Sequence, residues 1–266
     1  MTDPKIAETL WAVAREAADA ARDAILPHFR ARDLLADNKD EAGGFDPVTI
    51  ADKAGEDAIR KVLAAHRPMD GIIGEERGRQ AASSEFTWIL DPIDGTRAFL
   101  AGAPTWGTLI AVFQNGDPIL GLIDQPYIGE RFEGGLGRAT LDHSGQIQAL
   151  KCRSEPKLSG AVLTSTFPEI GTEAERQAFE RVRDQMKLTR YGLDCYGYAL
   201  VAAGHIDLVI EAGLNLYDIA APMAVVQAAG GVFTDWQGNP VRDGGQVIAA
   251  GNAELHAAAL QLLNSG

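Results

Sequence analysis

Two aspartates three residues apart stand beside a Gly-Thr pair, in the stretch Trp-Ile-Leu-Asp-Pro-Ile-Asp-Gly-Thr at residues 88–96. The apolar start of this stretch suits a buried strand, and Asp91 and Asp94 follow it directly. Carboxylates placed here can hold divalent cations, while the backbone N–H groups of Gly95 and Thr96 can bind an anion. Such a set could hydrolyse a phosphate ester. Asp, Pro and Gly are also common in simple turns after strands, so the stretch alone leaves both interpretations open.

Four further acidic residues stand where strands are expected to end or helices to begin. Glu75 follows the strand-like residues 71–73, and Glu211 ends a later expected strand. Asp52 and Asp218 stand where helices begin. Taken singly, Glu75 suits a solvated turn, Glu211 a surface position, and either aspartate a helix N-cap. Taken together they favour one site, because α/β folds build their sites at such positions.

Hydrophobic periodicity predicts the elements that must position these residues. A long amphipathic helix is expected over residues 5–30, and a second helix over 52–66 stops before Pro68. Strands are expected at 71–74, 86–90, 105–113, 119–124, 130–132, 162–165, 188–191, 208–211, 232–234 and 247–250. Further helices are expected at 172–186, 196–203, 218–229 and 253–263. This mixture predicts a layered α/β sandwich in two halves, residues 1–150 with most of the acidic ligands and 151–266 with the remainder.

The composition is that of a globular protein with a large acidic excess. The 266 residues include 24 Lys and Arg against 37 Asp and Glu, a net charge of −13. That balance argues against a nucleic-acid partner, which needs a basic stripe. No apolar run approaches a membrane span and residues 1–5 lack the layout of a secretory signal, so we expect a soluble cytoplasmic protein with no membrane partner. Cys152 and Cys195 form no metal-binding pair and are expected to be small buried thiols.

Apart from Glu211, these acidic residues belong to four motifs that occur in a characteristic order. They are Asp-Pro-Val-Thr-x-Ala-Asp at 46–52, Gly-Glu-Glu at 74–76, Asp-Pro-Ile-Asp-Gly-Thr at 91–96 and Tyr-Asp-x-Ala-Ala at 217–221. In this order the motifs resemble the inositol monophosphatase superfamily, over nearly the whole chain. The resemblance implies an αβαβα five-layer sandwich of the inositol monophosphatase and fructose-1,6-bisphosphatase type. It further implies a homodimeric phosphomonoesterase that acts on a small phosphate monoester with two to three Mg²⁺ ions and is inhibited by Li⁺.

The resemblance also implies how the acidic residues share the Mg²⁺ ions. The ligands of the first ion would be Glu75, Asp91 and the backbone carbonyl of Ile93. The ligands of the second would be Asp91, Asp94 and Asp218, with Asp52 helping to bind a weaker third. Hard oxygen ligands of this kind suit Mg²⁺.

The same resemblance assigns the catalytic and phosphate-binding groups. Thr96 and Glu75 would orient and deprotonate the attacking water, and the N–H groups of Gly95 and Thr96 would receive the phosphate. Lys39 matches a basic position near the phosphate, although a solvated loop lysine is an equally simple interpretation. The motif disfavours a haloacid-dehalogenase-type nucleophile, which needs Asp-x-Asp, because Asp91 and Asp94 are one residue too far apart. A histidine phosphatase would need an Arg-His-Gly triplet, which the sequence lacks.

The residues after Arg190 indicate the leaving group. Inositol phosphatases typically read Gly-Ser/Thr-Ala-Ala there, whereas this chain reads Gly-Leu-Asp-Cys-Tyr at 192–196. The extra carboxylate of Asp194, expected to face the same pocket as Glu211, favours a positively charged leaving group. The alternative is that Asp194 only caps the following helix.

Asp-Cys-Tyr and the segments at 96–99 and 104–111 resemble the histidinol-phosphatase branch of the superfamily. Histidinol phosphate carries an ammonium group and an imidazole that is partly protonated near neutral pH. We therefore expect a histidinol phosphatase of histidine biosynthesis. The first alternative is an inositol-1-phosphate or broad sugar-phosphate phosphatase, and a remote one is a non-catalytic interaction protein on the same scaffold.

Overall fold

A computed structural model describes residues 2–32, 36–38, 47–155 and 157–265. Its helices are α1 (Pro4–Ile25), α2 (Ile50–His66), α3 (Thr96–Ala101), α4 (Glu173–Arg183), α5 (Cys195–Ala202), α6 (Leu216–Ala228) and α7 (Ala253–Leu263), with short 3-10 turns η1 (Leu26–His28) and η2 (Leu158–Gly160). The strands up to residue 149 are β1 (Ala36–Asn38), β2 (Pro47–Thr49), β3 (Gly71–Gly74), β4 (Gly78–Gln80), β5 (Phe86–Asp94), β6 (Gly107–Gln114), β7 (Asp117–Gln125), β8 (Glu130–Gly135), β9 (Arg138–His143) and β10 (Gln146–Ala149). The later strands are β11 (Val162–Ser165), β12 (Leu188–Tyr191), β13 (Leu208–Asn215), β14 (Val232–Thr234) and β15 (Gly244–Ala250).

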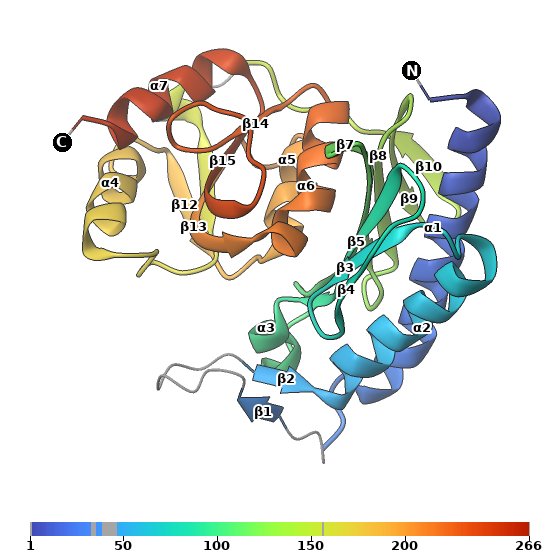
Figure 1. Cartoon of the computed structure of the whole chain (residues 1–266). Helices are drawn as coiled ribbons and strands as arrows, with labels where there is room; N and C mark the ends of the chain where they lie inside the picture. Colours follow the sequence, from blue (N-terminus) through green and yellow to red (C-terminus); the bar gives the residue numbers. More distant parts are fainter. Residues whose placement is uncertain (1, 33–35, 39–46, 156, 266) are drawn as a thin grey trace.

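These elements stack in five alternating layers (Figure 1). The pair α1 and α2 covers one face of an eight-stranded sheet, and α5 and α6 lie between that sheet and a five-stranded sheet. Helices α4 and α7 cover the outer face of the second sheet. The predicted αβαβα sandwich is therefore confirmed.

Strand direction differs between the two sheets and matters for the site. The first sheet has the order β10-β9-β8-β7-β6-β5-β3-β4, and β3 and β5 are its parallel neighbours. The second has the order β12-β11-β13-β15-β14, in which β11 runs parallel to both β12 and β13. Carboxyl ends of parallel strands meet at one sheet edge, so residues that follow β3 and β5, or β11 and β13, come together.

The first helix shows how the apolar pattern anchors the outer layer. Its buried stripe includes Leu10, Ala14, Ala17 and Ala21, at the spacing of one helix face. The helix ends at Ile25, earlier than predicted, because Pro27 has no N–H to continue the α-helical hydrogen bonds and the chain turns as η1. The apolar periodicity thus located the helix correctly, and only its end was placed too late.

Several other predicted bounds were wrong. Strand β5 does not stop at Leu90 but continues to Asp94, with a register irregularity after Asp91. Strand β13 likewise continues past Glu211 to Asn215, so Glu211 lies inside the strand and not at its end. The hairpin of β9 and β10 was missed, because most of its residues are polar and half-exposed or exposed.

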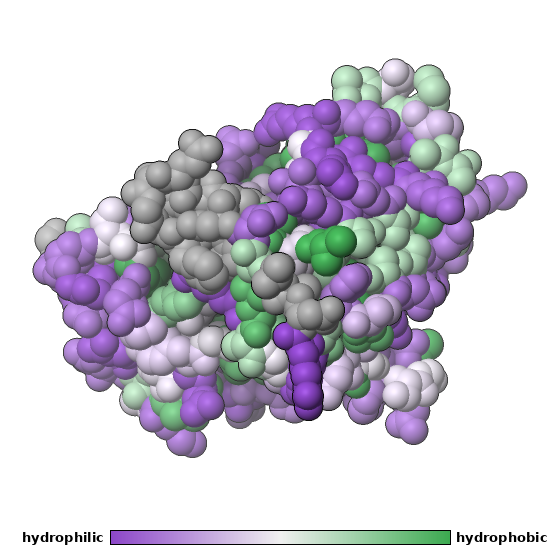
Figure 2. Space-filling view, turned by 90° about the horizontal axis from the view of Figure 1, so that it is seen from below, coloured by the Kyte–Doolittle hydropathy of each residue, from purple (hydrophilic) through white to green (hydrophobic). Residues whose placement is uncertain are grey.

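The surface carries few large apolar side chains. Figure 2 shows one face as mostly hydrophilic, with hydrophobic residues in small separate groups. The exposed large apolar residues of the described chain come from different elements and are Ile6, Ile50, Met69, Tyr127, Ile147, Phe167 and Leu188. None of the helices in the described ranges is long and apolar enough to cross a bilayer. The core between the two sheets draws on both halves of the chain, and the predicted division near residue 150 stays a prediction.

Candidate active site

Parallel pairing of β3 and β5 places Glu75 beside Asp91. Gly74 lies opposite Leu90 in the register, and the Glu75 N–H donates to the Leu90 carbonyl at 3.2 Å. Each acidic residue directly follows one member of this pair. Burial is the largest cause of the raised pKa of Asp91, and the charge of Glu75 is the next. Neighbouring carboxylates of this kind favour a bound proton or cation over two free charges.

The irregular end of β5 turns Asp91 and Asp94 toward one cavity. The Ile93 N–H donates to the Asp91 carboxylate at 3.0 Å, and the Thr96 hydroxyl lies 3.2 Å from the Ile93 carbonyl. The Thr108 hydroxyl on β6 donates to the Pro92 carbonyl at 2.8 Å, which holds the irregular end of β5 against its neighbouring strand. These bonds replace the regular ladder where the register shifts.

Asp52 approaches the same turn from α2. The alternative interpretation of Asp52 as a simple N-cap does not hold, because Thr49 is the N-cap, and Asp52 is the third helical residue and closes a capping box with it. The second oxygen of the Asp52 carboxylate lies 3.4 Å from the Thr96 hydroxyl. Burial raises the pKa of Asp52, the bonds from Thr49 lower it, and the nearby charge of Glu75 raises it again.

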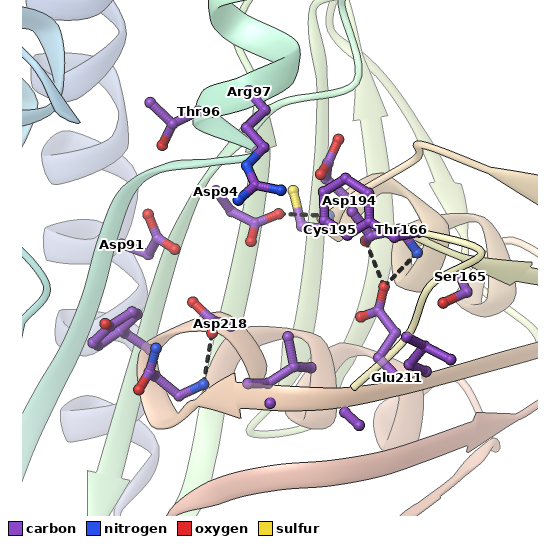
Figure 3. Close-up of a pocket in the computed structure, with 18 of the residues that line it drawn as sticks. Asp91, Asp94, Thr96, Arg97, Ser165, Thr166, Asp194, Cys195, Glu211 and Asp218 are labelled. Atoms are coloured by element: carbon purple, nitrogen blue, oxygen red, sulfur yellow. Dashed lines mark hydrogen bonds between the residues drawn. The ribbon is translucent and has the colours of Figure 1, made fainter. Parts of the chain in front are cut away.

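Asp218 completes the acidic cluster from the second half of the chain. It is the third residue of α6 and accepts the Asn215 N–H at 2.6 Å, so it too is not itself the N-cap. One oxygen from each of Asp91, Asp94 and Asp218 lies within 4.8 Å of the other two. Figure 3 shows the three side chains pointing toward one another from β5 and α6.

The electrostatics of this cluster fit a divalent cation. Burial and then the charges of Glu75, Asp94 and Asp218 raise the pKa of Asp91 well above its usual value. Burial and neighbouring aspartates do the same to Asp94, and burial raises the pKa of Asp218 to about 7. Carboxylates that repel one another at this distance are stabilised in the ionised form by a hard cation. The donor set, all carboxylate oxygens with a nearby carbonyl, is the one that Mg²⁺ prefers.

The cluster forms one side of a cavity of about 310 Å³ whose other side carries Asp194 and Glu211. Gly95 adopts a left-handed φ of 84°, and a Cβ there would lie 2.8 Å from the Asp194 Cγ. The glycine therefore allows α3 to approach Asp194 closely. The Cys195 N–H, next in the chain, donates to Asp94 at 2.6 Å.

Asp194 occupies the N-cap position of α5, but its side chain makes no capping hydrogen bond there. Its carboxylate lines the cavity and accepts the Thr105 hydroxyl at 3.3 Å. Burial and then the charge of Glu211 raise the pKa of Asp194 to about 6, while Arg97 lowers it. The interpretation of Asp194 as only a helix cap is therefore wrong.

Glu211 is buried and held in a fixed orientation. Its carboxylate accepts the Thr166 N–H at 2.9 Å and the Tyr198 hydroxyl at 2.6 Å, and it also accepts the Thr166 hydroxyl (Figure 3). Burial raises its pKa, and the bonds from Thr166 and Tyr198 lower it. Because these donors stabilise its charge, Glu211 presents a negative potential to the cavity.

Several lining residues were missed by the sequence reasoning, among them Arg97 and Phe167. Arg97 follows Thr96 on α3, and its guanidinium lies over the Phe167 ring at 4.9 Å. Phe167 comes two residues after β11 ends, and β11 is a parallel neighbour of β13. Because sites in α/β folds form at the carboxyl ends of parallel strands, Phe167 could have been predicted as a lining residue from the sequence. Lys39 lies outside the described residues.

The fold and the site define a layered α/β protein whose cavity joins a cluster of carboxylates that could hold a cation to a second acidic wall. The profile of the inositol monophosphatase family matches residues 7–265, and the chain belongs to this family, whose members are phosphatases. It is 42% identical over 263 residues to the chloroplastic bifunctional phosphatase IMPL2 of Arabidopsis thaliana, covering 95% of this chain and 74% of that protein. It is 35% identical to the histidinol-phosphatase of Mycobacterium tuberculosis, and the match covers 94% of this chain and 95% of that protein. An inositol monophosphatase from Zymomonas mobilis has a similar structure, with a TM-score of 0.85, 39% identity and coverage of 98% and 99%.

Proposed function

We propose that this protein hydrolyses histidinol phosphate to histidinol and inorganic phosphate and depends on Mg²⁺. The observation that carries the proposal is that Asp194 and Glu211 share one cavity with the acidic cluster. A phosphate bound at the cluster would leave its alcohol portion facing these two carboxylates. The ammonium and imidazolium of histidinol phosphate would pair with them, whereas a polyol has no positive charge to offer.

The acidic residues would hold two to three Mg²⁺ ions. Glu75, Asp91 and the Ile93 carbonyl would hold one, Asp91, Asp94 and Asp218 a second, and Asp52 would assist a third. When bound, Mg²⁺ supplies positive charge that offsets the phosphate dianion and lowers the pKa of water.

The protein groups around Thr96 would prepare the attacking water. The Thr96 hydroxyl has its proton within reach of the Asp52 carboxylate and the Ile93 carbonyl. Its oxygen lone pairs can therefore accept a hydrogen bond from water, and Glu75 can accept the proton that the water loses. The N–H groups of Gly95 and Thr96 would bind the phosphate, and the departing alcohol would remain beside Asp194.

The first test is a comparison of kcat/KM for histidinol phosphate, inositol-1-phosphate and adenosine bisphosphate in Mg²⁺. We expect histidinol phosphate to be preferred by about tenfold or more, since one charge-assisted bond contributes roughly 1.5–3 kcal/mol. A preference for inositol-1-phosphate would support the second candidate, which the similarity to the Zymomonas mobilis enzyme favours. Activity on none of them would indicate a non-catalytic scaffold. We also propose a homodimer, to be measured by light scattering.

Replacing Asp194 with asparagine should change substrate preference more than catalysis itself. We expect kcat/KM for histidinol phosphate to fall about 10- to 100-fold, because a neutral amide loses the charge-assisted bond. The value for inositol-1-phosphate should change much less. Taking the ratio of the two substrates cancels any effect that Asp194 has on the neighbouring Asp94.

Glu169→Gln is the matched control, because Glu169 lines the same cavity but is exposed. Water screens an exposed charge, so this variant should alter the substrate ratio only slightly. Equal losses on both substrates in Asp194→Asn would show that Asp194 does not select the leaving group.

A further inference from the structure

The turn that carries Glu75 is held by a second buried carboxylate, that of Glu56 on α2. Glu56 has no solvent exposure, and its two oxygens accept the N–H groups of Glu76 at 2.7 Å and Arg77 at 3.1 Å. These are the two backbone donors that directly follow Glu75. The turn between β3 and β4 is therefore fastened to α2 through its main chain.

Arg60 closes this arrangement one helical turn further along α2. Its Nε donates to Glu56 at 2.7 Å, and its Nη2 donates to the Gly78 carbonyl at 2.6 Å. A buried carboxylate is stable only when charge and hydrogen bonds compensate its lost hydration. Here a cation and two backbone donors do so, which fixes the position of Glu56 as well as that of the turn.

Gly74 shows how closely the end of β3 approaches Glu56. A Cβ at Gly74 would lie 2.1 Å from a Glu56 carboxylate oxygen, closer than any real contact. The glycine immediately before Glu75 thus makes the room that the Glu56 carboxylate fills. The sequence Gly-Glu-Glu at this turn and the glutamate on α2 are complementary parts of one contact.

The same face of α2 also reaches Thr96. Asp52 and Glu56 are four residues apart, so their side chains lie one above the other on the helix. Asp52 contacts the Thr96 hydroxyl, while Glu56 holds the backbone next to Glu75. One helix therefore contacts Thr96 directly and also holds the turn that carries Glu75, the two residues to which the proposed mechanism assigns water activation.

We infer that Glu56 is a positioning residue that sets the orientation of Glu75 toward the cation site and the attacking water. The inference rests on the proposed function, in which Glu75 is a Mg²⁺ ligand and the proton acceptor. Glu56 acts only through the turn. Its loss would free the backbone of Glu76 and Arg77 from α2, so that the Glu75 side chain would no longer be held in one orientation toward Asp91.

The test is Glu56→Gln, with Mg²⁺ binding measured by titration calorimetry in the absence of substrate. Glutamine can still accept one backbone N–H, but it loses the charge pair with Arg60 and offers one acceptor oxygen instead of two. We expect Mg²⁺ to bind about 10- to 100-fold more weakly, as is typical when a partner of a metal ligand is removed. The kcat at saturating Mg²⁺ should also fall, with little change in KM.

Asp57→Asn is the matched control. Asp57 is the next residue of α2 and pairs with Arg77 of the same turn at 2.6 Å, but it does so at the exposed surface. This variant should keep the Mg²⁺ affinity and kcat of the wild type. Should Glu56→Gln fail to fold, Gly74→Ala tests the same contact by displacing the carboxylate sterically while its charge is kept.

The possible results separate the two proposals. A Glu56→Gln protein with a lower Tm but wild-type Mg²⁺ affinity and kcat would overturn the inference and leave Glu56 as a structural ion pair. Equal losses in Asp57→Asn and Glu56→Gln would overturn it as well. A wild-type protein that binds no Mg²⁺ would instead refute the proposed function, and the positioning role with it.

Discussion

Asp94→Asn is expected to abolish phosphatase activity while the protein stays folded. Asp94 is one of three carboxylates with oxygens within 4.8 Å of one another, and it also accepts the Cys195 N–H at 2.6 Å. Asparagine keeps an oxygen that can accept this N–H, so the local structure should survive. It removes the negative charge that would hold a Mg²⁺ ion against the phosphate. Losing about 4 kcal/mol of charge stabilisation corresponds to roughly a thousandfold lower kcat.

The measurement is kcat on histidinol phosphate at saturating Mg²⁺, together with circular dichroism and Tm. Asp117→Asn, at an exposed aspartate on β7, is the control and should behave as wild type. The Tm of Asp94→Asn in chelator should not fall and is expected to rise, because the substitution removes one of several mutually repelling buried charges. Retained activity in Mg²⁺ would refute the assignment of Asp94 as a ligand.

The parts of this site that could be predicted from the sequence are those whose residues lie close together in the chain. The Asp91–Thr96 motif directly follows an apolar strand segment, and Glu75 directly follows another. Parallel pairing of these two strands was therefore enough to predict that Asp91 and Glu75 lie side by side. The capping box of α2 was also readable, because Thr49 and Asp52 have its three-residue spacing. In the missed β9–β10 hairpin, Ala139 and Leu141 of β9 pack against the core, but neither strand has a fully buried residue and β10 is exposed throughout, so the alternating apolar signal was short and weak.

Side-chain direction at the second wall of the cavity could not be predicted in this way. Asp194 has a positive φ of 49°, which turns it away from capping α5 and toward Gly95, nearly a hundred residues earlier in the chain. Arg97 meets Phe167 across a similarly long separation. Such contacts depend on how the two sheets are placed around α5 and α6. The resemblance of residues 192–196 to the superfamily predicted that Asp194 faces the pocket, and the structure shows how the backbone turns it there.

If the proposed function is correct, the placement of the acidic residues would let a family fold change substrate without changing its reaction. The cluster is built from the end of β5 and the start of α6, whereas the second wall is built from the start of α5 and the middle of β13. Residues at the second wall can therefore vary while the cluster remains intact. Thr166 and Tyr198 hold Glu211, but neither belongs to the cluster. This separation is consistent with family relatives named for different phosphate esters.

The second large effect is expected in the pH dependence of stability without metal. Burial raises the pKa of Asp218 to about 7 from a usual value of 3.8, and the pKa values of Asp91 and Asp94 are also raised. Between about pH 4 and 7 the folded protein therefore binds protons that the unfolded chain has released. The contribution of these groups to stability is greatest at the acidic end of this window and is lost as the pH rises to 7. In chelator, the Tm contribution of the cluster should thus fall from pH 5 to pH 8.

Saturating Mg²⁺ should reverse this trend, because the cation competes with protons for the same carboxylates and stabilises their ionised form. The quantity to measure is the Tm in Mg²⁺ minus the Tm in chelator, since this difference cancels titrations elsewhere, such as that of the buried His256, whose pKa is lowered by burial. We expect the difference to be small at pH 5 and to grow toward pH 8. In Asp94→Asn it should be much reduced at every pH. A difference that is equal at pH 5 and pH 8 in the wild type would mean that the clustered carboxylates are not the groups that bind Mg²⁺.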